Sequence, residues 1–125
     1  MASEKKVCLI VDDSRAVRKV MAKIIDELAL SYIEASDGQE ALQLCQQQMP
    51  DVILLDWNMP NMDGMEFFVA FQQVPGHETC RVVFCTTETE MAKVIVALDA
   101  GADEYIMKPF TKEIVESKLQ QVGVL

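Results

Sequence analysis

Five short apolar runs alternate along the chain with segments of helical periodicity, and this alternation restricts the fold more than any other feature. The runs span Val7–Val11, Tyr32–Ala35, Val52–Leu55, Val82–Cys85 and Tyr105–Met107. The third and fourth have no polar alternation, which is typical of strands covered on both faces. The second run is more mixed, so we expect it at an edge of the sheet.

Helices are predicted between and after the runs, from apolar residues spaced three and four positions apart. These stripes are Val17, Val20, Met21, Ile24, Ile25 and Leu28; Ala41, Leu42, Leu44 and Cys45; Met65, Phe68 and Phe71; Met91, Val94, Ile95 and Leu98; and Ile114, Val115, Leu119 and Val122. We expect N-caps at Ser14, Asp63 and Thr111, and capping boxes formed by Ser36 with Gln39 and by Thr87 with Glu90. Five strands alternating with five helices predict an α/β fold, a parallel sheet between two layers of helices.

Length and charge exclude several classes of protein. The 125 residues are enough for one domain, and the net charge of −9 argues against binding to nucleic acid or anionic lipid through bulk charge. No apolar run approaches the roughly 18 residues that a transmembrane helix requires. Because only a five-residue apolar run follows the N-terminal residues 1–6, we expect no signal peptide and a cytosolic protein.

The cysteines and the single histidine are predicted to have no chemical role. Cys8, Cys45, Cys80 and Cys85 form no CxxC motif and have no paired histidine ligand, so neither a zinc site nor a thioredoxin-like site is supported. We expect free, structural thiols in a reducing compartment. His77 is expected to be exposed in a loop.

Polar groups gather where the predicted strands end. Asp12 and Asp13 follow the first run, Asp56 the third, Thr86 the fourth and Lys108 the fifth. Ligands of open α/β sheets bind at the carboxyl ends of the strands. If the first and third strands are neighbours, three carboxylates converge there, and a cation would relieve their repulsion. Hard oxygen ligands that leave room for water and phosphate favour Mg²⁺.

The same groups suit acyl-phosphate chemistry. A carboxylate can attack a phosphoryl donor as a nucleophile. Mg²⁺, the ammonium of Lys108 and the hydroxyl of Thr86 would then neutralise the phosphoryl oxygens.

Four motifs carry a resemblance to a known family. They are Val11-Asp12-Asp13-Ser14, the stretch Asp56-Trp57-Asn58-Met59-Pro60-Asn61-Met62-Asp63-Gly64, Thr86-Thr87-Glu88 and Lys108-Pro109-Phe110. In this order and spacing the chain resembles the receiver domain of two-component response regulators, and the second motif is most similar to CheY-like chemotaxis regulators. The resemblance implies a doubly wound, flavodoxin-like (βα)5 sandwich with strand order 2-1-3-4-5. It also implies one receiver domain over residues 1–125, with no output domain.

The resemblance further implies a role for each site residue. Asp56 is the expected phosphoacceptor. Asp13, Asp56 and the backbone carbonyl of Asn58 are the expected direct Mg²⁺ ligands, with Asp12 acting through water. Lys108 would pair with the phosphoryl group and precede a cis peptide bond to Pro109. Thr86 and Tyr105 would be the switch residues, Asn58 and Glu88 would tune the phosphoryl lifetime toward a short signal, and Trp57 would sense Mg²⁺ and phosphate.

The function expected from this resemblance is that of a stand-alone response regulator rather than an enzyme. It would take its phosphoryl group from a histidine kinase or phosphotransfer protein, contacted through Arg15, Arg18, Lys19 and Ala22. It would then bind a downstream protein, with the flagellar motor switch as the leading candidate. The binding face would comprise the fourth helix, with Val96 and Ala97 exposed, the fifth strand with Tyr105, and the fifth helix. A phosphorelay shuttle and a phosphate sink are the alternatives.

Two functions of other classes are disfavoured by single positions. A Mg²⁺-dependent phosphatase of the haloacid dehalogenase type would need an acid/base aspartate two residues after Asp56, where this chain has Asn58. A flavodoxin-like cofactor binder would need a phosphate-binding loop after the first strand. Asp12 and Asp13 stand there and would repel a cofactor phosphate.

Overall fold

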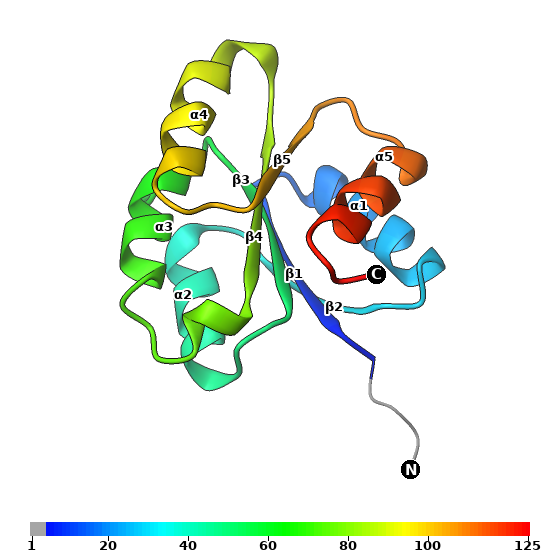
Figure 1. Ribbon diagram of the computed structural model, residues 1–125, viewed down its shortest axis with the longest axis horizontal. Helices are drawn as coiled ribbons and strands as arrows, with labels where there is room; N and C mark the ends of the chain where they lie inside the picture. The colour runs from blue at the N-terminus through cyan, green and yellow to red at the C-terminus, as the bar shows by residue number, and fades with distance from the viewer. Residues whose placement is uncertain (1–4) are drawn as a thin grey trace.

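A five-stranded parallel sheet forms the centre of the molecule (Figure 1). The computed structural model describes residues 5–125, so residues 1–4 of the N-terminal segment, where we expect no signal peptide, lie outside the described part. The elements are β1 (Val7–Val11), α1 (Arg15–Glu27), β2 (Ser31–Ala35), α2 (Gly38–Gln47), β3 (Val52–Asp56), α3 (Gly64–Phe71), β4 (Arg81–Thr86), α4 (Met91–Asp99), β5 (Glu104–Met107) and α5 (Lys112–Gln121), with short 3₁₀ turns η1 (His77–Thr79) and η2 (Glu88–Glu90). The strand order β2-β1-β3-β4-β5 confirms the predicted flavodoxin-like topology, with β2 at an edge.

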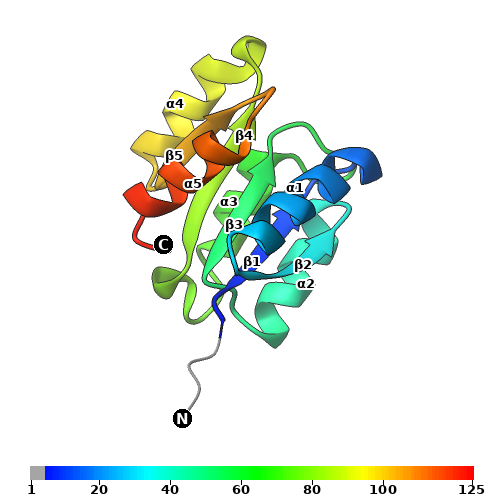
Figure 2. The ribbon, with the colours of Figure 1, turned by 90° about the vertical axis from the view of Figure 1, so that its right-hand side faces the viewer.

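Helices α1 and α5 cover one face of the sheet, and α2, α3 and α4 cover the other (Figures 1 and 2). Successive strand residues point to opposite faces, so each strand contributes to both cores. In β1, for example, Leu9 and Val11 face α2–α4, whereas Cys8 and Ile10 face α1 and α5. Burial on both sides explains why β1, β3 and β4 have nearly unbroken apolar sequences.

Helix starts agree with the predicted caps at three positions and differ at two. Ser14, Asp63 and Thr111 each accept a hydrogen bond from the backbone three residues later. The box predicted from Ser36 and Gln39 is wrong, because Asp37 is the N-cap of α2 and the carboxylate of Glu40 returns to the backbone N–H of Ser36. The box predicted from Thr87 and Glu90 is also wrong: η2 intervenes before α4, and Thr87 makes no side-chain cap bond.

The predicted apolar stripes match the buried helix faces except at their margins. Val20, Ile95 and Ile114 were expected in the core but are 55%, 52% and 41% exposed. Ala97, expected at the surface, is buried together with Val94, because the core side of α4 is centred on these two residues three positions apart. Val96 is exposed as predicted.

The cysteines are buried and free, as expected. Burial raises the pKa of Cys45 to about 11 and, with smaller contributions from nearby charges, the pKa of Cys85 to about 12. The expectation of an exposed His77 is wrong: its ring lies half-buried in η1, edge-on to Phe71 at a centroid distance of 5.9 Å. None of the helices within residues 5–125 is long and apolar enough to cross a membrane.

Candidate functional site

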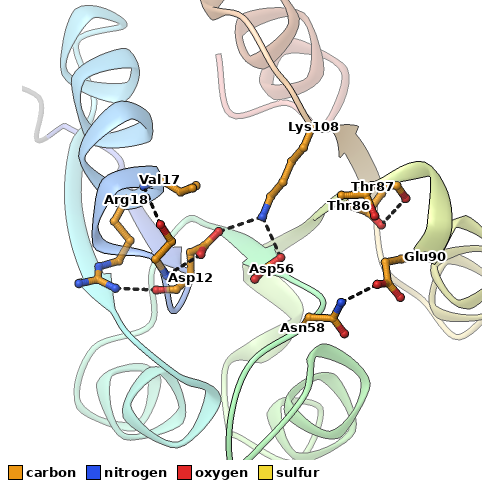
Figure 3. Close-up of polar contacts among 10 residues, drawn as sticks. Asp12, Val17, Arg18, Asp56, Asn58, Thr86, Thr87, Glu90 and Lys108 are labelled. Carbon is orange, nitrogen blue, oxygen red and sulfur yellow. Dashed lines mark hydrogen bonds and ion pairs between the residues drawn. The ribbon is translucent and has the colours of Figure 1, made fainter.

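Four strand ends bring the predicted site residues together at one edge of the sheet (Figure 3). Asp56 and Thr86 are the last residues of β3 and β4, Asp12 directly follows β1, and Lys108 directly follows β5. The sheet is parallel, so these ends share one edge, and β1 and β3 are hydrogen-bonded neighbours. Within residues 5–125, Asp12, Asp56 and Thr86 are the three buried polar side chains of the protein, at 4%, 8% and 1% exposure. Burial of polar groups is costly unless they are paired or have a ligand, and here it is confined to one place.

Lys108 is the cation of this cluster. Its Nζ donates to Oδ1 of Asp56 at 2.9 Å and to Oδ2 of Asp12 at 3.1 Å (Figure 3). The Lys108–Pro109 peptide bond is cis, as expected. Burial by itself would lower the pKa of Lys108, but the hydrogen bonds and charges of Asp56 and Asp12 outweigh it and raise that pKa. Lys108 is therefore charged at neutral pH.

Asp56 is in an unfavourable electrostatic position. Burial raises the pKa of its carboxyl group, and the negative charges of Asp12 and Asp13 raise it further. The hydrogen bond and charge of Lys108 act in the opposite direction without cancelling the increase in the pKa. A cation that bound beside Asp56 would favour its ionised form, which is the nucleophilic form of a carboxylate.

Asp12 is held in place by contacts at both its side chain and its backbone. Its Oδ1 accepts from the backbone N–H of Ser14 at 2.8 Å, and its carbonyl oxygen accepts from the Arg18 guanidinium at 2.6 Å. Arg18 in turn pairs with Glu34 at 3.0 Å. These contacts leave Oδ2 of Asp12 directed at Lys108 (Figure 3).

The carboxylates of Asp12, Asp13 and Asp56 are close enough to share one metal ion. One oxygen from each lies within 4.8 Å of the others, and Asp13 is exposed to solvent. The ammonium of Lys108 pairs with two of the three carboxylates, those of Asp12 and Asp56, so the cluster carries excess negative charge. Hard oxygen donors with an open, solvent-facing side fit Mg²⁺ and leave coordination positions for water and phosphate oxygens.

The side chain of Asn58 points toward the segment before α4. Its Nδ2 donates to Oε1 of Glu90 (Figure 3), while the predicted roles of Asn58 and Glu88 in the phosphoryl lifetime stay predictions. Glu88 is exposed on η2. The sequence predicts Glu90 only as part of a capping box with Thr87, and its spacing from Thr86 contains no signal for this contact.

The expected switch residues lie beside the cluster. The hydroxyl of Thr86 donates to the carbonyl oxygen of Thr87 at 3.1 Å, so it is turned toward the loop before α4. The ring of Tyr105 is half-buried, with Nζ of Lys118 4.6 Å from its centroid. Trp57 is buried beneath the site against Phe84, at a centroid distance of 5.1 Å.

The residues expected to contact a kinase are only partly accessible. Arg15 and Lys19 are exposed on α1, while the side chain of Arg18 is 15% exposed and is engaged with Glu34. Ala22 was expected at the surface but lies in the core under α1, at 6% exposure. An apolar groove of about 290 Å³ runs beside Lys108 between α1 and the segment after β5; Ala16, Val17, Val20, Lys108, Pro109 and Phe110 line it.

Comparison with known proteins identifies the family. The sequence profile of the response regulator receiver domain matches residues 8–120. The chain belongs to the response regulator receiver family. It is 36% identical over 116 residues to a chemotaxis protein CheY homolog of Campylobacter jejuni, covering 91% of this chain and 89% of that protein.

Other similarities agree with the family and with the CheY-like fold. The structure of chemotaxis protein CheY4 of Vibrio cholerae superimposes with a TM-score of 0.88 at 33% identity, covering 94% of this chain and 98% of that one. A "Probable transcriptional regulator ycf27" of Guillardia theta is 35% identical over 118 residues, and the matched region is 94% of this chain but 45% of that relative. This chain is therefore a CheY-like receiver, and receiver domains are signalling proteins.

Proposed function

We propose that this receiver accepts a phosphoryl group on Asp56 from the phosphohistidine of a histidine kinase or phosphotransfer protein. The observation that supports this most directly is the position of the Asp56 carboxylate. It lies 2.9 Å from the ammonium of Lys108 and shares a potential metal site with Asp12 and Asp13. A buried carboxylate beside a fixed cation can act as a nucleophile toward a phosphoryl group.

In the proposed reaction, a carboxylate oxygen of Asp56 attacks phosphorus while the bond from phosphorus to the donor imidazole nitrogen breaks. The electron pair of that bond leaves with the imidazole, which takes up a proton, and Asp56 becomes an acyl phosphate. Lys108 neutralises negative charge on the transferred group from where it already lies. Asp13, Asp56 and the backbone carbonyl of Asn58 would hold Mg²⁺ directly, with Asp12 acting through water. When bound, Mg²⁺ would supply the remaining charge compensation.

The phosphoryl group would then act as a switch. It carries a charge of about −1.5 to −2 at pH 7, in place of the single charge of the Asp56 carboxylate, and it adds strong acceptor oxygens. The hydroxyl of Thr86 would leave the carbonyl oxygen of Thr87 to donate to the phosphoryl group, and Tyr105 would move into the space this frees. A local charge change would thereby bias the segment that leads into α4.

Output is proposed to occur through protein binding at the face formed by α4, β5 and α5. Exposed apolar side chains on this face support the assignment, namely Ile95, Val96 and Ile114. The similarity to chemotaxis proteins favours a stand-alone regulator of motility, with the flagellar motor switch as its target. The groove beside Lys108 is proposed to receive the histidine-bearing partner, because it opens next to the phosphorylation site.

Incubation with acetyl phosphate and Mg²⁺ tests the proposal, with intact mass as the readout. The wild type is expected to gain one phosphoryl group and to lose it after the donor is removed. Asp56→Asn should gain none, whereas Asp99→Asn, which changes an exposed aspartate at the end of α4, should behave as the wild type. A wild type that stays unmodified would refute the proposal. Rapid loss would support the role of Asn58 and Glu88 in a short-lived chemotaxis signal, and slow loss would favour the relay shuttle.

A further inference from the structure

The carboxylate of Glu90 connects two segments that both border the phosphorylation site. Glu90 is the last residue of η2, directly before α4, and Asn58 lies two residues after Asp56. The amide of Asn58 donates to Oε1 of Glu90 (Figure 3). Within residues 5–125, this is the one hydrogen bond that joins the loop 57–63 to the segment 87–90.

Glu90 is held in a defined orientation. Its side chain is only 13% exposed, and its second oxygen, Oε2, lies 3.6 Å from Nζ of Lys93 one turn along α4. Both carboxylate oxygens therefore face donors, one on the loop after β3 and one on α4. The donor, Asn58, is exposed, so the hydrogen bond is shielded from solvent only on the side of the carboxylate.

We propose that Glu90 is a positioning residue for phosphorylation of Asp56. In the unphosphorylated protein it holds the side-chain amide of Asn58 toward α4, and it releases that amide when Asp56 becomes phosphorylated. This inference rests on the proposed function, because it assigns to Glu90 of this chain a regulatory role at the phosphorylation site. Phosphorylation replaces the single charge of the Asp56 carboxylate with about two negative charges on a phosphoryl group, which attract the Asn58 amide and repel the Glu90 carboxylate.

Release of the Asn58 amide from Glu90 would link phosphorylation of Asp56 to the start of α4. Thr86 is a second donor at this edge that does not contact Asp56, because its hydroxyl donates to the carbonyl oxygen of Thr87. Two donors that could serve a phosphoryl group are therefore both held by the segment between β4 and α4. Breaking the bond between Asn58 and Glu90 frees the first turn of α4 from the loop after β3, in the helix that carries the exposed residues Ile95 and Val96.

The hydrogen bond between Asn58 and Glu90 would stabilise the protein only before phosphorylation, so it makes phosphorylation of Asp56 less favourable. Glu90→Ala is therefore expected to raise the rate constant of phosphorylation by a small donor. The expected increase is about two- to tenfold, the range that corresponds to the net contribution of one hydrogen bond. Glu90→Gln keeps an oxygen that can accept from Asn58 but loses the charge that strengthens the bond, so its increase should be clearly smaller than that of Glu90→Ala.

The experiment measures phosphoprotein formation over time by intact mass, with acetyl phosphate and Mg²⁺. It compares the wild type, Glu90→Ala, Glu90→Gln, Asn58→Ala and the double variant Asn58→Ala with Glu90→Ala. Asp99→Ala is the control for loss of an exposed negative charge from α4 and should match the wild type. In the Asn58→Ala background, Glu90→Ala should have no further effect, because the bond is already absent.

Three results would overturn the inference. The first is a Glu90→Ala variant that is phosphorylated no faster than the wild type. The second is an equal increase in Glu90→Gln, which would assign the effect to charge instead of to the hydrogen bond. The third is an undiminished effect of Glu90→Ala when Asn58 is absent. If the wild type itself forms no phosphoprotein, the proposed function fails as well, which distinguishes that failure from these three.

Discussion

At the scale of single residues, Asp56 combines burial with incomplete charge compensation. Its carboxylate is 8% exposed, and one ammonium serves the cluster of Asp12, Asp13 and Asp56. Burial, followed by the neighbouring carboxylates, raises the pKa of Asp56 despite the hydrogen bond from Lys108. A buried carboxylate with incomplete charge compensation is expected to lower the free energy of unfolding. Proteins retain strain and unfavourable charge of this kind where function requires it.

The pH dependence of stability tests this interpretation. Because the folded-state pKa of Asp56 lies above its unfolded-state pKa, its contribution to stability is present below the unfolded-state pKa. That contribution is lost as the pH rises through the folded-state pKa. At pH 7, without added metal, Asp56→Asn should therefore unfold at a higher urea concentration than the wild type. The difference should shrink as the pH falls toward 4, the region of the ordinary carboxyl pKa.

Urea denaturation in buffer with a chelator measures both proteins across this pH range. Asp99→Asn serves as the reference, because Asp99 is exposed and its substitution should leave the pH dependence unchanged. A constant difference between Asp56→Asn and the wild type at every pH would contradict the assignment of the effect to ionisation of Asp56.

At the scale of secondary-structure elements, short-range contacts decide where the helices begin. The side chain of Asp37 accepts from the backbone N–H of Glu40 at 2.8 Å, so it satisfies a donor that the first turn of α2 leaves free. Ser36 stands one residue earlier, and its hydroxyl donates to the carboxylate of Glu40 at 3.1 Å. Both residues are good N-cap types, and the backbone conformation selects Asp37.

Alanine substitutions at these two positions should therefore differ. Asp37→Ala is expected to lower the free energy of unfolding by about 1 kcal/mol, as is typical for loss of an N-cap. Ser36→Ala should cost less, because the backbone N–H of Ser36 still donates to Glu40 at 2.6 Å. Urea denaturation of both variants at neutral pH provides the comparison. A larger loss for Ser36→Ala would show that the cap lies one residue earlier.

At the scale of the whole molecule, folding creates the acidic cluster. Asp12 and Asp13 follow β1, and Asp56 ends β3, more than forty residues later in the sequence. Only the pairing of β1 with β3 brings their oxygens within 4.8 Å of one another. A metal ion that needs all three carboxylates binds the folded chain and not the unfolded one, so binding must stabilise the fold.

Mg²⁺ is accordingly expected to raise the free energy of unfolding. At a free concentration ten times the dissociation constant, the increase should be about 1.4 kcal/mol. Asp13→Asn should lose most of this increase, because it removes the exposed carboxylate of the cluster, while Asp99→Asn should retain it. Thermal unfolding over a series of Mg²⁺ concentrations measures the effect. Equal stabilisation of both variants would indicate that Mg²⁺ binds elsewhere.

The strands, the helices and the residues at the strand ends could be predicted from the sequence alone. Strands and helices depend on local periodicity and on the order of residues along the chain. The apolar runs that end near Asp56 and Thr86 can therefore be recognised in the sequence. The ends of each predicted strand lie within one residue of the ends of the observed strand. For β1, β3 and β4 the match follows from burial on both faces, which makes their sequences almost entirely apolar. The family motifs added the strand order, which periodicity leaves open.

Which side chains meet and which stay at the surface depends on how the elements pack in three dimensions. Asn58 donates to Glu90, a contact that the turn η2 permits by placing Glu90 between β4 and α4. Ile95 is exposed and Ala97 is buried, because the placement of α4 against the sheet selects its inner face. A helical stripe specifies a face to within about one residue, whereas a hydrogen bond across 32 positions depends on how separate elements pack.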